Sequence, residues 1–260
     1  MLNLSELTDK VRALAIEAGD FIREERKKFH REAIEKKHAH DYVSYVDKES
    51  EKKIVTRLKE LLPEAGFIAE EGSGTLNDEQ YCWLVDPLDG TTNFIHDNAP
   101  YCVSIALRSK KELLLGVVYE ICRNECFWTY KGAPSYLNGN EIHVSAISNL
   151  DDSFIALGFP YATEEYKPMA NHLVNTLYGN VAGLRLMGAA AVELCYIAAG
   201  RFEARIEAFI GPWDIAAGTI ILQNAGGMIT DFKGGDSYSS GSQVLASNGR
   251  IHRDLLNIID

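Results

Sequence analysis

Apolar positions at the start of the chain follow a helical period. Between residues 4 and 22 they recur at steps of three and four, which places them on one face of an amphipathic helix. A second helix is expected to begin with Asp47 as its N-cap and to stop at Pro63, and its apolar face is formed by Ile54, Leu58, Leu61 and Leu62. Both helices are expected to serve as scaffold.

The middle of the chain changes to short β-prone runs. Glycine, asparagine, lysine or aspartate separates these runs, which cover residues 81–85, 101–107, 113–119 and 125–130. This pattern predicts an extended, mostly antiparallel sheet connected by hairpins. Turn-forming residues at 132–134 and 138–140 follow, so we place a boundary near residue 145.

Strands and helices alternate in the last part of the chain. Helices are predicted at residues 188–199, after Trp213 and from Ile251, and strands at residues 153–158, 202–206, 228–231 and 243–246. Such alternation is typical of α/β structure. We therefore expect residues 1–145 to form an α+β half with the larger antiparallel sheet, and residues 146–260 to form an α/β half.

Composition narrows the class of protein. The 260 residues are 46% hydrophobic and 24% charged, which is ordinary globular usage. The net charge of −11 argues against a nucleic-acid or anionic-membrane surface, because both need a basic field. No apolar run approaches the roughly 20 residues of a membrane span, and no signal peptide is recognisable. The five cysteines fit reduced core thiols, so we expect a cytoplasmic protein.

The segment after the predicted strand at 81–85 carries the most informative chemistry. Two carboxylates three residues apart, Asp86 and Asp89, are followed by Gly90 and Thr91, which can open a helix. Such a turn can place both carboxylates on one side, leave the Leu88 carbonyl free, and aim the amides of Gly90 and Thr91 at an anion. Hard divalent cations prefer such oxygen ligands. Taken alone, an Asp-x-x-Asp-Gly stretch is more often a structural turn.

The run Asp86-Pro87-Leu88-Asp89-Gly90-Thr91-Thr92-Asn93-Phe94 resembles the signature of the inositol monophosphatase family. Further stretches match the same family pattern over nearly the whole chain. They are Asp41-Tyr42-Val43-Ser44-Tyr45-Val46-Asp47, Glu70-Glu71-Gly72, residues 188–200, Pro212-Trp213-Asp214 and Gln223-Asn224-Ala225-Gly226-Gly227. The resemblance implies a layered α-β-α-β-α sandwich with two sheets and an active site between the two halves.

The resemblance also implies a set of metal ligands. Glu70, Asp86 and the Leu88 carbonyl would hold a first Mg²⁺, and Asp86, Asp89 and Asp214 would hold a second. Glu70 would reach a weaker third ion through water. All of these ligands are oxygens, as Mg²⁺ prefers.

Roles in the reaction follow from the same resemblance. Thr91 paired to Asp47, or Glu70 in their place, would help to deprotonate the attacking water. The amides of Gly90 and Thr91 would cradle the phosphoryl oxygens, and Asp89, Ala190 and Glu207 would also contact the substrate. Without the resemblance, Glu207 is as compatible with a surface strand residue as with a residue that accepts hydrogen bonds from ring hydroxyls.

The implied activity is hydrolysis of a small polyol phosphate monoester, with myo-inositol monophosphate as the leading substrate. Related phosphatases acting on fructose 1,6-bisphosphate, nucleotide bisphosphates or histidinol phosphate are the alternatives, and a non-catalytic regulator that kept the fold is another. Relatives are often lithium-sensitive homodimers, and we expect the same here.

Lys36 matches a family lysine by its spacing to Asp47 but equally fits a solvated charged face. Departures at residues 97–100, 133–135 and Ala189 concern loop shape and substrate choice.

Overall fold

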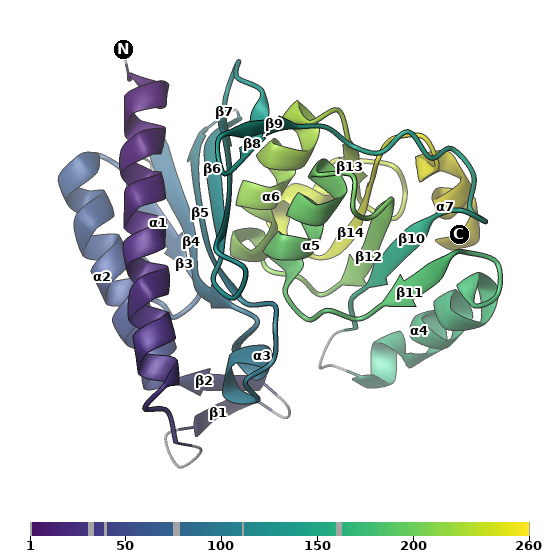
Figure 1. Cartoon of the computed structure of the whole chain (residues 1–260), viewed down its shortest axis with the longest axis horizontal. Helices are drawn as coiled ribbons and strands as arrows, with labels where there is room; N and C mark the ends of the chain where they lie inside the picture. The colour runs from purple at the N-terminus through teal and green to yellow at the C-terminus, as the bar shows by residue number, and fades with distance from the viewer. Residues whose placement is uncertain are drawn as a thin grey trace.

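The computed structural model describes residues 2–30, 34–38, 41–74, 79–110, 112–159 and 163–259. Its elements form five layers in the order α-β-α-β-α (Figure 1). Two helices cover the outer face of a seven-stranded sheet, two more lie between the sheets, and further helices cover the far side of a five-stranded sheet. The predicted layered sandwich is confirmed.

The larger sheet has the strand order β3-β4-β5-β6-β7-β8-β9. Only β3 and β4 are parallel neighbours, and the other pairs are antiparallel, as the sequence predicted. Three short strands add to the four predicted ones. The bounds are β3 (Gly66–Ala69), β4 (Tyr81–Asp89), β5 (Cys102–Ser109), β6 (Leu113–Glu120), β7 (Glu125–Tyr130), β8 (Ser135–Leu137) and β9 (Asn140–Ile142).

Two helices pack on the outer face of this sheet. The first, α1 (Leu4–Arg26), runs one turn beyond the predicted end, where Arg23 donates to the Ile121 carbonyl at 2.9 Å. The second is α2 (Tyr45–Leu61). The prediction that Asp47 caps α2 is wrong, because the extended residue Ser44 is the N-cap, while Asp47 is the third helical residue and accepts from the Ser44 amide at 2.9 Å.

The smaller sheet has the order β11-β10-β12-β14-β13. β10 lies parallel to both of its neighbours, and β14 lies antiparallel to β12 and β13. The outer face carries α4 (Thr163–Leu177) and α7 (His252–Ile259), which share an apolar core with β10 and β12. The bounds are β10 (Phe154–Leu157), β11 (Gly183–Arg185), β12 (Ala204–Ala208), β13 (Met228–Thr230) and β14 (Gln243–Ser247). The element α4 and strand β11 were outside the prediction.

The central layer consists of α5 (Ala190–Ala198) and α6 (Pro212–Asn224), both buried between the sheets. Small residues let these elements approach closely. A side chain at Gly116 on β6 would collide with the Ala217 carbonyl of α6 at 2.6 Å, and one at Gly218 would meet Leu194 of α5 at 2.7 Å. The layer therefore brings the start of both helices close to the large sheet.

The remaining elements are an antiparallel pair, β1 (Ile34–His38) and β2 (Asp41–Ser44), the short helix α3 (Thr91–Ile95), and a 3₁₀ turn, η2 (Ser237–Ser240). Lys36 pairs with Tyr42 through the backbone, and its side chain lies outside the described residues. All strands of the large sheet precede residue 145 and all strands of the small one follow it; the division into two domains stays a prediction. No described helix is long and apolar enough to cross a membrane.

Candidate active site

The N-terminal half of α2 carries a buried polar face that holds the end of β4. Asp47, Ser50 and Glu51 are fully buried, although they lie on the side of α2 that also bears Ile54 and Leu58. The Ser50 hydroxyl donates to the Pro87 carbonyl at 3.2 Å. This helix therefore fixes the position of the strand end that carries the predicted carboxylates.

Glu51 organises the segment that follows Glu70. Its two carboxylate oxygens accept from the amides of Glu71 at 2.7 Å and Ser73 at 2.9 Å. The Glu70 amide donates to the Val85 carbonyl at 3.2 Å, which anchors Glu70 beside the last residues of β4. Two strand ends thus bring Glu70 and Asp86 together.

Strand β4 ends in an irregular turn that presents Asp86 and Asp89. The pairing with β5 shifts between these two residues, and both are buried. The Leu88 amide donates to the Asp86 carboxylate at 2.9 Å. The Leu88 carbonyl, which we expected to be free, faces the Thr91 hydroxyl at 3.1 Å; a carbonyl oxygen has two lone pairs, so one stays available.

Gly90 allows the chain to turn directly from β4 into α3. Its φ of 91° lies in the left-handed region, and a side chain there would meet the Pro100 carbonyl at 3.0 Å. The turn brings the Thr91 hydroxyl 2.8 Å from the Asp47 carboxylate, so the predicted pairing of these residues is present. One hydroxyl proton serves either Asp47 or the Leu88 carbonyl at a given moment.

Asp214 comes to this place from the C-terminal part of the chain. Pro212 starts α6, and Asp214 in the first turn accepts from the Gly211 amide at 2.7 Å. The Trp213 carbonyl accepts from Ser104 on β5 at 3.4 Å, which ties the start of α6 to the large sheet.

The four predicted carboxylates influence one another electrostatically. Burial raises the pKa of Asp86, and the charges of Glu70, Asp89 and Asp214 raise it further. Burial also raises the pKa of Asp214, again with Glu70 and Asp89 adding to the effect. Burial raises the pKa of Asp89 to about 7. The carboxylates are therefore gathered in one place, where their negative charges oppose ionisation.

The chemistry of this cluster suits a divalent cation, although its described side chains do not form a preformed coordination site. Within the described ranges, no group of three or more His, Cys, Asp or Glu side chains is arranged to hold a metal ion. Backbone amides instead hold the carboxylates of Asp86, Asp89 and Asp214. Their oxygens are the donors that Mg²⁺ prefers, and a bound cation would relieve the repulsion that raises the pKa values.

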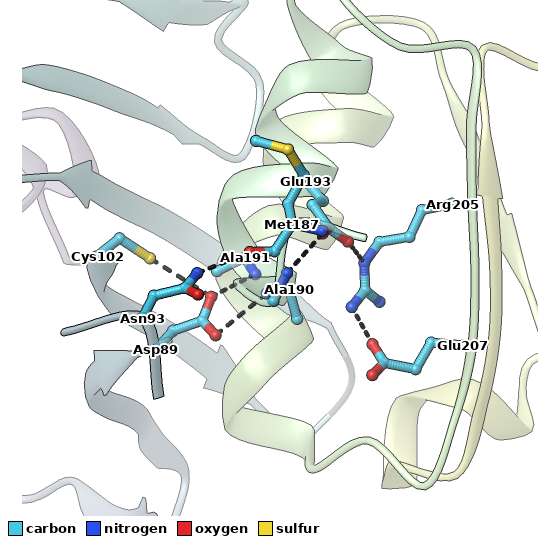
Figure 2. A network of polar contacts seen from close by, with 10 residues as sticks. Asp89, Asn93, Cys102, Met187, Ala190, Ala191, Glu193, Arg205 and Glu207 are labelled. Atoms are coloured by element: carbon cyan, nitrogen blue, oxygen red, sulfur yellow. Dashed lines mark hydrogen bonds and ion pairs between the residues drawn. The ribbon is translucent and has the colours of Figure 1, made fainter. Parts of the chain in front are cut away.

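The first backbone amides of α5 bind the Asp89 carboxylate. The Ala190 amide donates to one carboxylate oxygen of Asp89 at 3.1 Å and the Ala191 amide donates to the other at 2.8 Å, while the Cys102 thiol lies 3.5 Å away (Figure 2). The Ala190 amide, which we predicted to contact substrate, is thus engaged by Asp89. Its contact with substrate stays a prediction.

Glu207 does not lie on an open surface. Its side chain is 17% exposed and forms an ion pair with Arg205, two residues earlier on β12 (Figure 2). Arg205 in turn pairs with Glu193 on α5, and both of these side chains are almost completely buried. Glu207 is therefore part of a buried charge network behind the Asp89 contact.

A sequence profile decides the family. The profile of the inositol monophosphatase family matches residues 3–259. The chain belongs to the inositol monophosphatase family. The family is generally Mg²⁺-dependent, which agrees with the oxygen-rich cluster, and membership supports a phosphatase.

Relatives of this family member carry two kinds of name. "Nus factor SuhB" of Pasteurella multocida is 39% identical over 225 residues, which cover 86% of this chain and 84% of the relative. The solved inositol monophosphatase of Anabaena has a TM-score of 0.89 at 31% identity and covers 99% of this chain and 96% of that one.

A third relative, inositol monophosphatase II of Staphylococcus aureus, has been solved with two different ligands. The structure with inositol monophosphate has a TM-score of 0.80 at 25% identity, covering 96% of this chain and 92% of that one. The structure with 2'AMP has a TM-score of 0.82 at 26% identity, covering 97% and 93%.

Three buried charged residues of this family member were missed in the sequence. A charge on the apolar face of α2 is the signal for Glu51, because its position continues the spacing of Ile54 and Leu58. Arg205 and Glu193 gave no signal by themselves, since their pairing joins different elements.

Proposed function

We propose that this protein is a Mg²⁺-dependent phosphatase that hydrolyses the phosphate monoester of a small polyol, with myo-inositol monophosphate as the leading substrate. The observation that carries the proposal is the convergence of Glu70, Asp86, Asp89 and Asp214 on one place, where burial raises the pKa of the three aspartates and neighbouring negative charges raise the pKa of Asp86 and Asp214 further. Family membership supports the phosphatase chemistry.

The residues that would hold the metal are those named from the sequence. Glu70, Asp86 and the Leu88 carbonyl would hold a first Mg²⁺, Asp86, Asp89 and Asp214 a second, and Glu70 would reach a weaker third through water. When bound, these ions would neutralise phosphate charge and lower the pKa of the attacking water.

Thr91 and Asp47 would accept the proton of that water. The Thr91 hydroxyl is 2.8 Å from the Asp47 carboxylate, so it can take one proton while passing its own to Asp47. Burial raises the pKa of Asp47, which makes this carboxylate a better proton acceptor than an exposed aspartate. Glu70 is the alternative base.

The phosphoryl group would lie against the amides of Gly90 and Thr91, at the start of α3. Asp89, Ala190 and Glu207 would line the polyol side. Attack in line on phosphorus releases the alcohol directly, without a phosphoenzyme.

The substrate class is broader than inositol alone. The Staphylococcus aureus relative binds both inositol monophosphate and 2'AMP, so the pocket of one family member admits a cyclitol and a nucleotide. Phosphatases for fructose 1,6-bisphosphate, nucleotide bisphosphates and histidinol phosphate stay as alternatives for this chain.

A second candidate function comes from the names of the curated relatives. Several are called Nus factors, which favours a regulator that works by binding a partner. The presence of Glu70, Asp86, Asp89 and Asp214 favours the enzyme, since a pure binder has no need for all four. Homodimer formation, cytoplasmic location and lithium inhibition belong to the proposal as well.

Phosphate release separates these functions. The wild-type protein is assayed with and without Mg²⁺ on inositol monophosphate, fructose 1,6-bisphosphate, a nucleotide bisphosphate and histidinol phosphate. We expect Mg²⁺-dependent release, fastest from inositol monophosphate. A different preferred substrate would show that inositol monophosphate is not the main substrate. No release from any of the four compounds would favour the regulator.

A further inference from the structure

A buried guanidinium lies between two carboxylates in the C-terminal part of the structure. Arg205 on β12 is 2% exposed, and its Nε donates to Glu193 on α5 while its Nη2 donates to Glu207 (Figure 2). Its cross-strand partners are Ala156 and Ala246, both fully buried. These small neighbours leave room for an arginine in the middle of a sheet that is otherwise apolar at this depth.

The carboxylates of Glu193 and Glu207 accept different numbers of hydrogen bonds. One oxygen of Glu193 accepts from the amides of Met187 at 3.0 Å and Gly188 at 3.2 Å, and the other accepts from Arg205, so both oxygens of Glu193 are engaged. Glu207 receives a hydrogen bond on Oε2, and over the described part of the chain no donor is recorded for Oε1. Glu207 is also the more exposed of the two, at 17%. Its second oxygen is therefore the acceptor that the network leaves for a ligand.

Arg205 itself keeps an unused donor. Its Nη1 is buried and, among the described residues, has no hydrogen-bond partner. A buried unpaired donor is costly, so this nitrogen is expected to be satisfied by ordered water or a ligand oxygen. The guanidinium is thus built into the site with hydrogen-bonding capacity that the protein alone does not use.

The same network reaches the metal-binding side of the site. Glu193 holds the turn at Met187 and Gly188, and Asn93 of α3 donates to the Met187 carbonyl at 2.7 Å. The turn leads into α5, whose first amides hold Asp89 (Figure 2). Arg205 therefore connects Glu207, which we expect to face the polyol, with the helix start that positions a candidate metal ligand.

We propose that Arg205 is a specificity-determining positioning residue, which occupies one oxygen of Glu207 so that this carboxylate reads a single substrate hydroxyl. A free carboxylate can rotate and offer either oxygen to neighbouring hydroxyls, whereas a carboxylate whose Oε2 is held by a buried guanidinium presents Oε1 in one fixed orientation. The selected substrate class is a phosphate monoester with one correctly placed hydroxyl, rather than one with an obligatory vicinal pair. The proposal rests on the proposed function, because it concerns the polyol side of the same pocket.

Arg205→Lys tests this role, because an ammonium keeps the charge but cannot bridge both carboxylates as a planar fork does. The kcat/KM values for inositol monophosphate and for p-nitrophenyl phosphate, which has no ring hydroxyl, are compared. We expect the value for inositol monophosphate to fall about tenfold more than the value for p-nitrophenyl phosphate, mainly through KM. Arg185→Lys, on strand β11 at the edge of the same sheet, is the matched control and leaves the ratio unchanged.

The Glu207→Gln variant and the double variant show whether the two residues act together. Once Glu207 is neutral, Arg205→Lys should cause no further change in the substrate ratio. An unchanged ratio in Arg205→Lys, an equal loss for both substrates, or independent effects in the double variant would overturn the proposal. If wild type releases no phosphate from either substrate, the proposed function itself is wrong and this inference falls with it.

A wild-type measurement covers the case in which Arg205→Lys does not fold. Monodeoxy analogues of inositol monophosphate remove one hydroxyl at a time. We expect about a tenfold loss of kcat/KM for one analogue and much smaller losses for the analogues at adjacent positions. If two adjacent analogues lose comparably with wild type and both losses disappear in Glu207→Gln, Glu207 accepts from a vicinal pair of hydroxyls and the proposal is wrong.

Discussion

The Thr91 hydroxyl is the residue-scale feature on which the proton transfer depends. It lies between the Asp47 carboxylate and the Leu88 carbonyl, a candidate metal ligand. Thr91→Ala should lower kcat at least a hundredfold and leave KM within a few fold, since general base catalysis contributes about 10²–10⁴. Thr91→Ser keeps the hydroxyl and should retain most activity. If Thr91→Ala turns over at the wild-type rate in a steady-state assay, Glu70 is the base instead.

At the scale of elements, the start of α2 positions Asp47, the hydrogen-bond partner of Thr91 in the site. Ser44 accepts from the Val46 amide at 3.2 Å and its hydroxyl donates to Asp47 at 2.6 Å, so one side chain both caps the helix and holds the Thr91 partner. Ser44→Ala should lower the free energy of unfolding by about 1 kcal/mol or more. Thr56→Ala, at an exposed position of α2, should change it little. Urea unfolding measures both, and equal midpoints for the two variants would show that the cap is unimportant.

At the scale of the whole molecule, the carboxylates come from both parts of the chain and make stability depend on pH. Burial raises the pKa of Asp89 from 3.8 to about 7, so the folded state binds this proton more tightly than the unfolded state does. Without metal, stability from this group is present at low pH and is lost as pH rises from about 4 to about 7. Mg²⁺ should restore it, because a ligand of the folded state stabilises that state.

The difference in unfolding free energy between wild type and Asp89→Asn isolates this group. Without Mg²⁺, wild type should lose stability relative to the variant as pH rises through that window, and added Mg²⁺ should stabilise wild type more than the variant. Urea unfolding at a series of pH values measures the difference. A difference that is the same at every pH, with and without Mg²⁺, would contradict the raised pKa of buried Asp89.

The residues themselves predicted the local turn of this site, the family resemblance predicted the Thr91–Asp47 pair, and the Glu193–Arg205 pair was missed. The turn from β4 through Gly90 into α3 was predictable, because strand, carboxylates and glycine are neighbours in the chain. Asp47 was misplaced as a cap, because the helix begins three residues earlier, where Ser44 accepts from the Val46 amide. The Glu193–Arg205 pair could not be predicted, because nothing in either segment indicates that α5 and β12 meet there.

Phosphate release by Asp86→Asn tests the central claim most directly. Asp86 is assigned to both metal positions, and asparagine keeps its size while removing the charge that a divalent cation needs. In saturating Mg²⁺ with inositol monophosphate, we expect wild type to release phosphate and the folded variant to release almost none, as wild type does in excess chelator. Near wild-type turnover by Asp86→Asn, or release by wild type that persists in chelator, would contradict metal-dependent hydrolysis at this cluster.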